Sequence, residues 1–161
     1  MSEELGGVVF EHIADITPIR NDTGDVREEM PQSRYGKASE VALNRYGRGP
    51  FCKFTIPRIS QSQEGVYIFM VCGQPIYVGQ CENLGSRINT GYGNISPKNC
   101  YVGGQQTNCR INNLIFKAAN RGAHIRLLFH ESNDRYRVEG DLIRQLSPEW
   151  NRSTPSLLHP R

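Results

Sequence analysis

The sequence contains no long apolar run, no signal-peptide pattern and no internal repeat. No stretch of its 161 residues approaches the roughly 20 consecutive apolar residues that a membrane-spanning helix requires. The first four residues, Met-Ser-Glu-Glu, are acidic, whereas a secretory signal begins with basic and apolar residues. We therefore expect a cytoplasmic protein without a membrane partner. The length of the chain suggests one domain with an extension, or a compact domain with insertions.

The chain also contains no Cys-x-x-Cys pair. Its five cysteines, an odd number, stand at positions 52, 72, 81, 100 and 109. A structural zinc site normally shows closer ligand spacing, and disulfides are rare in the cytoplasm. The cysteine pattern therefore favours reduced thiols and argues against structural zinc.

The net charge of +3 is too weakly basic to establish nucleic-acid binding by itself. The distribution of charge is more informative, because basic and aromatic residues alternate in the N-terminal third. This segment contains Arg34, Tyr35, Lys37, Arg45, Tyr46, Arg48, Phe51, Lys53 and Arg58. Such a mixture suits phosphate contacts with some base stacking, and a solvated surface is the alternative interpretation.

What the sequence does contain is a hairpin pattern with one tyrosine on each arm. Residues 66–71 form an unbroken β-branched, aromatic and apolar run, residues 72–75 supply turn chemistry, and residues 76–78 form a shorter run. Because side chains alternate between strand faces, a two-residue loop alone would put Tyr67 and Tyr77 on opposite faces. If the two tyrosines share a site, we predict an odd-numbered loop or a compensating bulge.

Apolar periodicity predicts the remaining elements of an α+β fold. Strands are expected at residues 51–56 and 124–130, where apolar side chains alternate, and a short helix is expected at 37–46. Two longer helices are expected, one ending near residue 120 and one over residues 138–146.

The last of these helices carries a carboxylate on its apolar stripe. Glu139 falls on the same face as Leu142, Ile143 and Leu146. A charge on such a face requires a partner or a metal. Glu139 is therefore a candidate functional residue. By contrast, His124 and His130, at the ends of the predicted strand 124–130, are interpreted as edge or surface residues.

Taken together, these residues resemble the GIY-YIG nuclease superfamily. The two signature triplets correspond to Gly-Val-Tyr at 65–67 and Tyr-Val-Gly at 77–79. The arginine of the family matches Arg87 within Asn-Leu-Gly-Ser-Arg, its metal-binding glutamate matches Glu139, and its terminal asparagine matches Asn151 shortly after a proline. The five elements occur in family-like order and spacing over about residues 64–152, a little over half of the chain.

The resemblance implies a small three-stranded antiparallel sheet flanked by helices, with an N-terminal extension and an inserted loop. It also implies phosphodiester hydrolysis that depends on Mg²⁺, for which Mn²⁺ can substitute, and that leaves 5′-phosphate and 3′-hydroxyl ends. The implied roles are general base for Tyr67, orientation of water or phosphate for Tyr77, phosphate binding for Arg87, metal binding for Glu139 and positioning of the site for Asn151.

One position departs from the pattern of the family. A histidine or tyrosine often follows the arginine by four residues, but that position is Gly91 in this chain. Tyr92, one place later, is the nearest substitute as a second base or proton-relay group.

A long stretch at residues 89–107 is rich in glycine, asparagine and glutamine. A loop of this length in a compact domain is usually functional or disordered, and a plain surface excursion is the alternative. Amide side chains pair with base edges, and cationic side chains bind phosphate. The candidate DNA contacts are Arg48, Lys98, Gln105, Gln106 and Arg110.

We expect an N-terminal extension at 1–63, a catalytic domain at 64–152 with the insertion 89–107, and a tail at 153–161. No long C-terminal DNA-binding domain is present, which argues against a homing enzyme or a repair subunit. The preferred interpretation is a type II restriction endonuclease that cuts a specific short site in double-stranded DNA as a homodimer. The alternatives are a structure-specific or non-specific nuclease of repair or of a mobile element, and a catalytically inactive DNA-binding module.

Overall fold

The computed structural model describes residues 1–57 and 63–151. The tail expected at 153–161 and the basic residue Arg58 lie outside the described residues. None of the helices in the described ranges combines the length and the hydropathy that a membrane crossing needs.

The chain divides into two compact units. The first unit comprises residues 1–15, 57–85 and 124–161, and the second unit comprises residues 16–56 and 86–123. Both units are assembled from separated stretches of sequence, so neither corresponds to one continuous segment.

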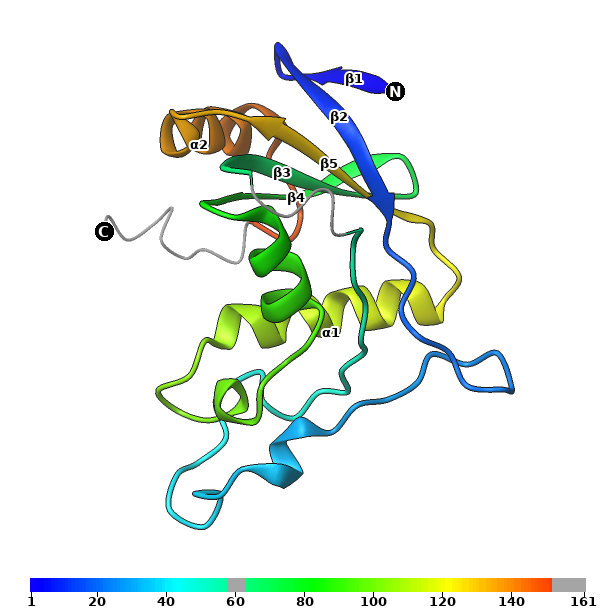
Figure 1. Ribbon diagram of the computed structural model, residues 1–161, viewed down its shortest axis with the longest axis vertical. Helices are drawn as coiled ribbons and strands as arrows, with labels where there is room; N and C mark the ends of the chain where they lie inside the picture. The colour runs from blue at the N-terminus through cyan, green and yellow to red at the C-terminus, as the bar shows by residue number, and fades with distance from the viewer. Residues whose placement is uncertain (58–62, 152–161) are drawn as a thin grey trace. The chain divides into compact units, whose positions relative to one another are not determined.

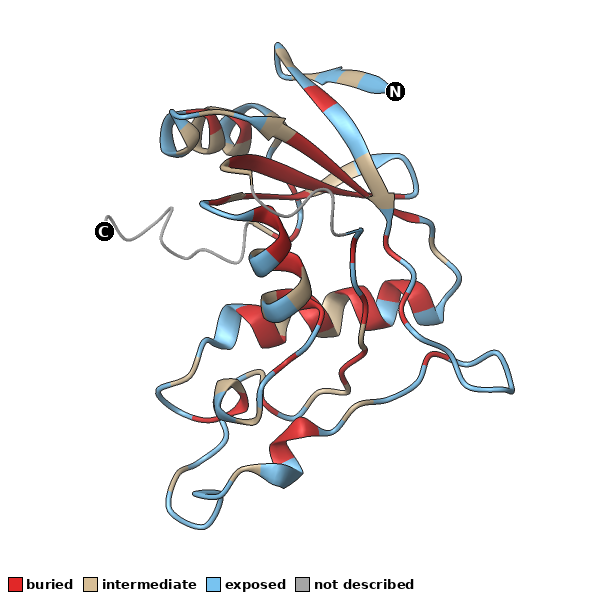
Figure 2. Ribbon diagram, viewed as in Figure 1, coloured by how far each residue is buried: buried red, intermediate tan, exposed pale blue. Residues whose placement is uncertain are grey.

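A five-stranded antiparallel sheet forms the centre of the first unit (Figure 1). Across the sheet the strands are β1 (Ser2–Leu5), β2 (Val8–Asp15), β5 (Ile125–Glu131), β3 (Gly65–Val71) and β4 (Gln74–Cys81). The strand β3 lies between β5 and β4 and is buried along its whole length (Figure 2).

The α+β class is confirmed, but the expectation of a three-stranded sheet was wrong in the number of strands. The three expected strands are present as β3, β4 and β5. The N-terminal residues, assigned to an extension, add two more strands, because β1 pairs with β2 and β2 pairs with β5. The pairing of β2 with β5 joins segments that are far apart in the sequence, so no local pattern indicates it.

The hairpin β3–β4 has the compensating bulge that a shared tyrosine face requires. Its loop is the two-residue turn Cys72-Gly73, in which both residues have positive φ, as in a type I′ turn. The register shifts between Phe69 and Met70, because Ile76 is left without a partner on β3. Beyond this bulge Phe69 pairs with Tyr77, which returns Tyr77 to the face occupied by every second residue of β3.

The helix α2 (Arg135–Leu146) packs on one face of the sheet (Figure 1). Its buried residues Val138 and Leu142 belong to a core cluster with Phe10, Val66, Ile68, Met70, Val78 and Leu128. Because side chains alternate along β3, this cluster lies on the face opposite to Tyr67 and Phe69. The expected stripe of Ile143 and Leu146 also packs against this cluster.

The second unit consists of helices and irregular chain. Its longest element is α1 (Gln106–Asn120), and three shorter helical segments are η1 (Pro31–Arg34), η3 (Ser86–Tyr92) and η4 (Pro97–Cys100). Figure 2 shows α1 with one buried and one exposed side. A core cluster of Phe51, Ile95, Cys100, Tyr101 and Cys109 holds the irregular segments against α1 and η4.

The predicted strand at 51–56 was wrong, and asparagine side chains explain why. This segment forms a single bridge, between Phe51 and Glu29. Asn112 bonds the N–H of Cys52 at 2.9 Å and its C=O at 2.8 Å, and Asn89 bonds the N–H of Ile56 at 2.7 Å and its C=O at 3.3 Å. Each side-chain amide supplies the donor and the acceptor that a neighbouring strand would otherwise supply.

The predicted helix at 37–46 was also wrong, because this segment forms turns. Asn44 Nδ2 donates to the backbone oxygen of Asn99 at 2.6 Å, and Leu43 forms a bridge with Tyr101. These contacts with the stretch before α1 replace the intrahelical hydrogen bonds.

All five cysteines are free, and four of them are buried. Burial raises the pKa of Cys52 to about 12, so this thiol is inert near neutral pH.

Candidate functional site

Three aromatic rings share one face of the β3–β4 hairpin. The ring centroids of Tyr67 and Tyr77 lie 6.4 Å apart, and Phe69 lies 5.9 Å from Tyr67 and 6.3 Å from Tyr77. Tyr67 is completely buried and Tyr77 nearly so. The two predicted tyrosines are therefore brought together by the bulge at Ile76.

The glycines of both signature triplets are required by close packing. Tyr67 pairs with Gly79 across the hairpin, and a Cβ at position 79 would lie only 2.3 Å from Cζ and Oη of Tyr67. A Cβ at Gly65 would lie 2.1 Å from the backbone oxygen of His130 on β5. One glycine thus makes room for the tyrosine ring, and the other makes room for the adjacent strand.

Asn151 holds the outer edge of β4. Its Oδ1 accepts from the N–H of Val78 at 2.8 Å, and its Nδ2 donates to the C=O of Val78 at 2.9 Å. The N–H of Trp150 donates to the C=O of Ile76, the bulged residue, at 2.9 Å. Among the described residues β4 has no neighbouring strand on that side, so these bonds occupy its free edge and hold the register that puts Tyr77 beside Tyr67.

Glu139 lies in the second turn of α2 and is half-buried. It directly follows Val138, which faces the core cluster opposite to the tyrosine face. Since α2 packs mainly along β4, Glu139 stands on the helix that borders the strand of the second signature triplet. Among the described residues, no three His, Cys, Asp or Glu side chains gather into a metal-binding group.

Arg87 and Tyr92 form a pair within the second unit. The guanidinium carbon of Arg87 lies 4.5 Å from the ring centroid of Tyr92, and Nη2 donates to the phenol oxygen at 2.9 Å. The segment η3 is a π-helix, in which residue i stacks near residue i+5, as the bond from the N–H of Gly93 to the C=O of Ile88 illustrates. The wider helical turn places Tyr92, rather than Gly91, over the arginine.

The five candidate DNA contacts all lie in the second unit. Arg48, Lys98, Gln105 and Gln106 are exposed, and Arg110 is half-exposed. Arg110 stands in the second turn of α1. Gln105 Oε1 accepts from Asn108 Nδ2 at 3.1 Å, so this acceptor already has a partner within the protein.

The charges of the two units have opposite sign. The second unit contains 12 of the 19 lysines and arginines but five of the 16 acids, a net charge of +7. The first unit has the remaining seven basic and 11 acidic residues, a net charge of −4. Between Ser86 and Ala123 there is no acidic residue at all. The small net charge of the whole chain therefore conceals a strongly basic unit.

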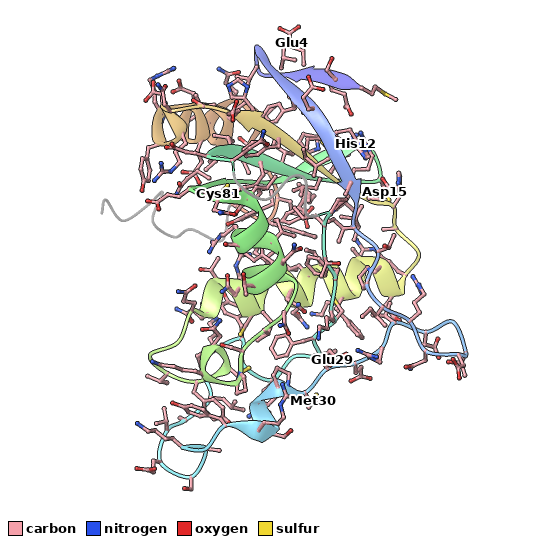
Figure 3. All side chains as sticks on the ribbon, viewed as in Figure 1. Glu4, His12, Asp15, Glu29, Met30 and Cys81 are labelled. Carbon is pink, nitrogen blue, oxygen red and sulfur yellow. The ribbon has the colours of Figure 1, made fainter. Side chains whose placement is uncertain are left out.

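The histidines at the ends of β5 lie at the surface, as expected. His124 Nε2 and His12 Nε2 contact Asp15 Oδ1 at 3.3 and 3.2 Å, and Figure 3 shows His12 and Asp15 on β2. Hydrogen bonds from His124 and then from His12 hold the pKa of the Asp15 carboxyl below its usual value. His130 Nδ1 lies 3.0 Å from the backbone oxygen of Val9.

Two residues with evident structural importance were missed by the sequence reasoning. Asn112, completely buried on α1, donates to the C=O of Tyr92 at 2.7 Å while it also holds Cys52. Arg135, in the first turn of α2, binds side chains at the ends of β3 and β4. A signal for Arg135 was available, since a cation in a first helical turn is disfavoured by the helix dipole and needs an explanation.

Compared with known proteins, the chain matches no family model and no curated protein. A solved structure of the E118A mutant of bacteriophage T4 EndoII has a similar fold, with a TM-score of 0.51 and 14% sequence identity. The alignment covers 88% of this chain and 90% of the EndoII chain. At this level of identity, the similarity establishes a shared fold.

Proposed function

We propose that this chain is a magnesium-dependent endonuclease of the GIY-YIG type that hydrolyses phosphodiester bonds of double-stranded DNA. The observation that carries the proposal is the shared face of Tyr67 and Tyr77, with Gly79 beneath the Tyr67 ring. The structural similarity to EndoII, a phage endonuclease, supports the same assignment.

Each candidate residue has a defined task in this proposal. Tyr67 accepts a proton from the attacking water, and Tyr77 orients the water or the phosphate. Arg87 binds a phosphate oxygen through charge-assisted hydrogen bonds, with Tyr92 stacked against its guanidinium. Asn151 acts at a distance, through its bonds to Val78.

The donor set fits magnesium better than a softer ion. Glu139 offers a hard carboxylate oxygen, and no cluster of three or more ligating side chains occurs in residues 1–57 and 63–151. Magnesium retains several waters and is commonly held by one or two carboxylates together with substrate phosphates. When bound, it would stabilise the negative charge that develops on the phosphate, and Mn²⁺ would serve in its place.

The second unit is proposed as the part that binds the DNA backbone. Its net charge of +7 and the absence of acids between Ser86 and Ala123 provide a surface for counterion release from DNA. Arg48, Lys98 and Arg110 would contact phosphates, while Gln105 and Gln106 would approach base edges. DNA affinity is then expected to fall steeply as salt concentration rises.

The preferred biological role is that of a type II restriction endonuclease acting as a homodimer on a short palindromic site. The decisive test is incubation of the purified protein with long unmethylated DNA, with Mg²⁺ or with a chelator, followed by electrophoresis. Discrete Mg²⁺-dependent bands would support a site-specific enzyme. A smear would favour a non-specific nuclease, and cleavage of branched DNA alone would favour a structure-specific one.

Two variants make this test specific to the proposed metal ligand. Glu139→Ala removes the carboxylate and is expected to abolish cleavage while DNA binding is retained. Glu11→Ala removes an exposed carboxylate from β2 of the same unit and is expected to cut like the wild type. Full activity of Glu139→Ala would refute the metal assignment. Tight DNA binding by a wild-type protein that cuts no DNA in any metal would favour the inactive binding module.

A further inference from the structure

Arg135 binds the residues that flank both signature triplets. Its Nε donates to Gln80 Oε1 at 2.6 Å, and Gln80 directly follows Gly79. Its Nη1 forms an ion pair with Glu64, which directly precedes Gly65. Its Nη2 contacts Glu82 at 3.3 Å, beyond the end of β4. One side chain thus connects the first turn of α2 to the ends of β3 and β4 where the triplets lie.

The position of this arginine requires an explanation. The first turn of a helix carries a partial positive charge, so a cation there is unfavourable unless other contacts offset it. The side chain of Arg135 is only 13% exposed, and the ring of Tyr136 lies 4.8 Å from its guanidinium carbon. The neighbouring Arg137, by contrast, is 64% exposed and pairs with Asp134, the residue before the helix, and with Asp141 on the helix.

We propose that Arg135 is a positioning residue for Glu139. Residues four apart lie on the same side of an α-helix, so Glu139 stands one turn beyond Arg135. When the guanidinium fixes the first turn of α2 to both strand ends, it also fixes the place of the Glu139 carboxylate relative to β3 and β4. This inference rests on the proposed function, because it assigns a task to Arg135 in supporting the metal ligand of that site.

The planar guanidinium is essential to this role. Arg135 directs Nε and its two terminal nitrogens toward three different side chains at once. A lysine in its place would keep the positive charge but would offer one compact ammonium, which cannot span Gln80, Glu64 and Glu82 together. Arg135→Lys therefore separates the geometry of the contacts from the charge.

The experiment measures Mn²⁺ binding to the protein saturated with a short DNA duplex that it cannot cleave, from the electron paramagnetic resonance signal of the unbound ion, with the duplex alone as the blank. Changing a residue that orients a metal ligand typically weakens metal affinity by about 10–100-fold. Arg135→Lys is therefore expected to weaken Mn²⁺ binding at least tenfold, and the matched control Arg137→Lys on the same helix is expected to change it less than twofold. Amide exchange along β5 should remain as in the wild type in both variants, and exchange at Gln80 should accelerate in Arg135→Lys alone.

The possible results separate this inference from the proposed function. Equal Mn²⁺ binding by Arg135→Lys and Arg137→Lys, in a protein that cuts DNA, would overturn the positioning role and leave the nuclease proposal standing. Loss of protection throughout β5 in Arg135→Lys would make the residue a general stabiliser and would also overturn it. A wild-type protein that neither binds Mn²⁺ nor cuts DNA would overturn the nuclease proposal, and the inference with it.

Discussion

Asn151 makes the strongest quantitative prediction, because its side chain holds both backbone groups of a completely buried residue. Val78 is fully inaccessible, and Asn151 bonds its N–H at 2.8 Å and its C=O at 2.9 Å. Leaving a buried polar group without a partner costs roughly 1–3 kcal/mol, so two such groups in Asn151→Ala give about 2–4 kcal/mol once some water enters. A domain of ordinary stability, about 5–15 kcal/mol, survives this loss and remains measurable.

Asn151→Asp provides a more discriminating variant. The carboxylate still accepts from the N–H of Val78, but it directs an acceptor at the C=O of Val78, where the amide placed a donor. Protonation of the carboxyl restores a donor, so the native state binds this proton more tightly than the unfolded state does. The deficit of Asn151→Asp relative to the wild type should therefore shrink as pH falls toward about 4, where an aspartic acid takes up its proton.

The assays are urea denaturation, for the free energy of unfolding, and amide exchange at Val78. Asn133→Ala, which changes an exposed asparagine before α2, is the matched control and should cost less than about 0.5 kcal/mol. The cleavage rate of Asn151→Ala should fall even where the protein is fully folded, because a loosened β4 no longer fixes Tyr77 on the face of Tyr67. Unchanged exchange at Val78, or a loss below about 0.5 kcal/mol, would refute the reasoning.

Four further predictions follow from single contacts. Tyr67→Phe removes only the hydroxyl and should lower the cleavage rate about 10²-fold or more. Gly79→Ala forces a Cβ to 2.3 Å from the buried Tyr67 ring and should cost about 1–3 kcal/mol in urea titrations. Cys72→Asn suits the left-handed turn position, φ 50°, and should stabilise by up to about 1 kcal/mol. Gly91→Ser, whose Cβ meets Asn108 Oδ1 at 3.7 Å, gives this unbonded buried oxygen a donor and should stabilise by about 1 kcal/mol on thermal melting.

The sequence predicted those parts of the fold whose signals are local. The hairpin, its need for a bulge, the helices α1 and α2 and the strand β5 all follow from apolar periodicity and turn residues within a short window. The pairing of β2 with β5 was not predictable in this way, since it depends on a contact between distant segments. Strand length and hydrophobic alternation in residues 2–15 are compatible with several partners.

The two wrong element predictions have a common physical cause. Residues 51–56 alternate as a strand does, and residues 37–46 have the composition of a short helix. In residues 51–56 the side chains of Asn112 and Asn89 bond the backbone, and in residues 37–46 Asn44 Oδ1 accepts from the N–H of Tyr46. Side-chain amides compete with secondary structure for the same hydrogen bonds, and the sequence does not reveal which backbone groups they will reach.

The residues of the candidate site also differ in whether the local sequence could predict them. The tyrosines and glycines of the triplets could be located from sequence because their spacing fixes a hairpin. Tyr92 could be placed beside Arg87 only after the π-helical turn of η3 was known, since an ordinary α-helix would have favoured Gly91. Arg135 was overlooked because its partners stand at the far ends of two strands.

The residues of the signature triplets therefore have a packing role that does not depend on whether the protein catalyses a reaction. The ring of Tyr67 leaves room only for glycine at position 79, and the backbone of β5 leaves room only for glycine at position 65. The bulge and the hydrogen bonds of Asn151 set the register of Tyr77. A protein that had lost catalysis would still need these residues to keep its hairpin. The case for a nuclease over a binding module accordingly depends on Arg87 and Glu139, which lie outside the hairpin.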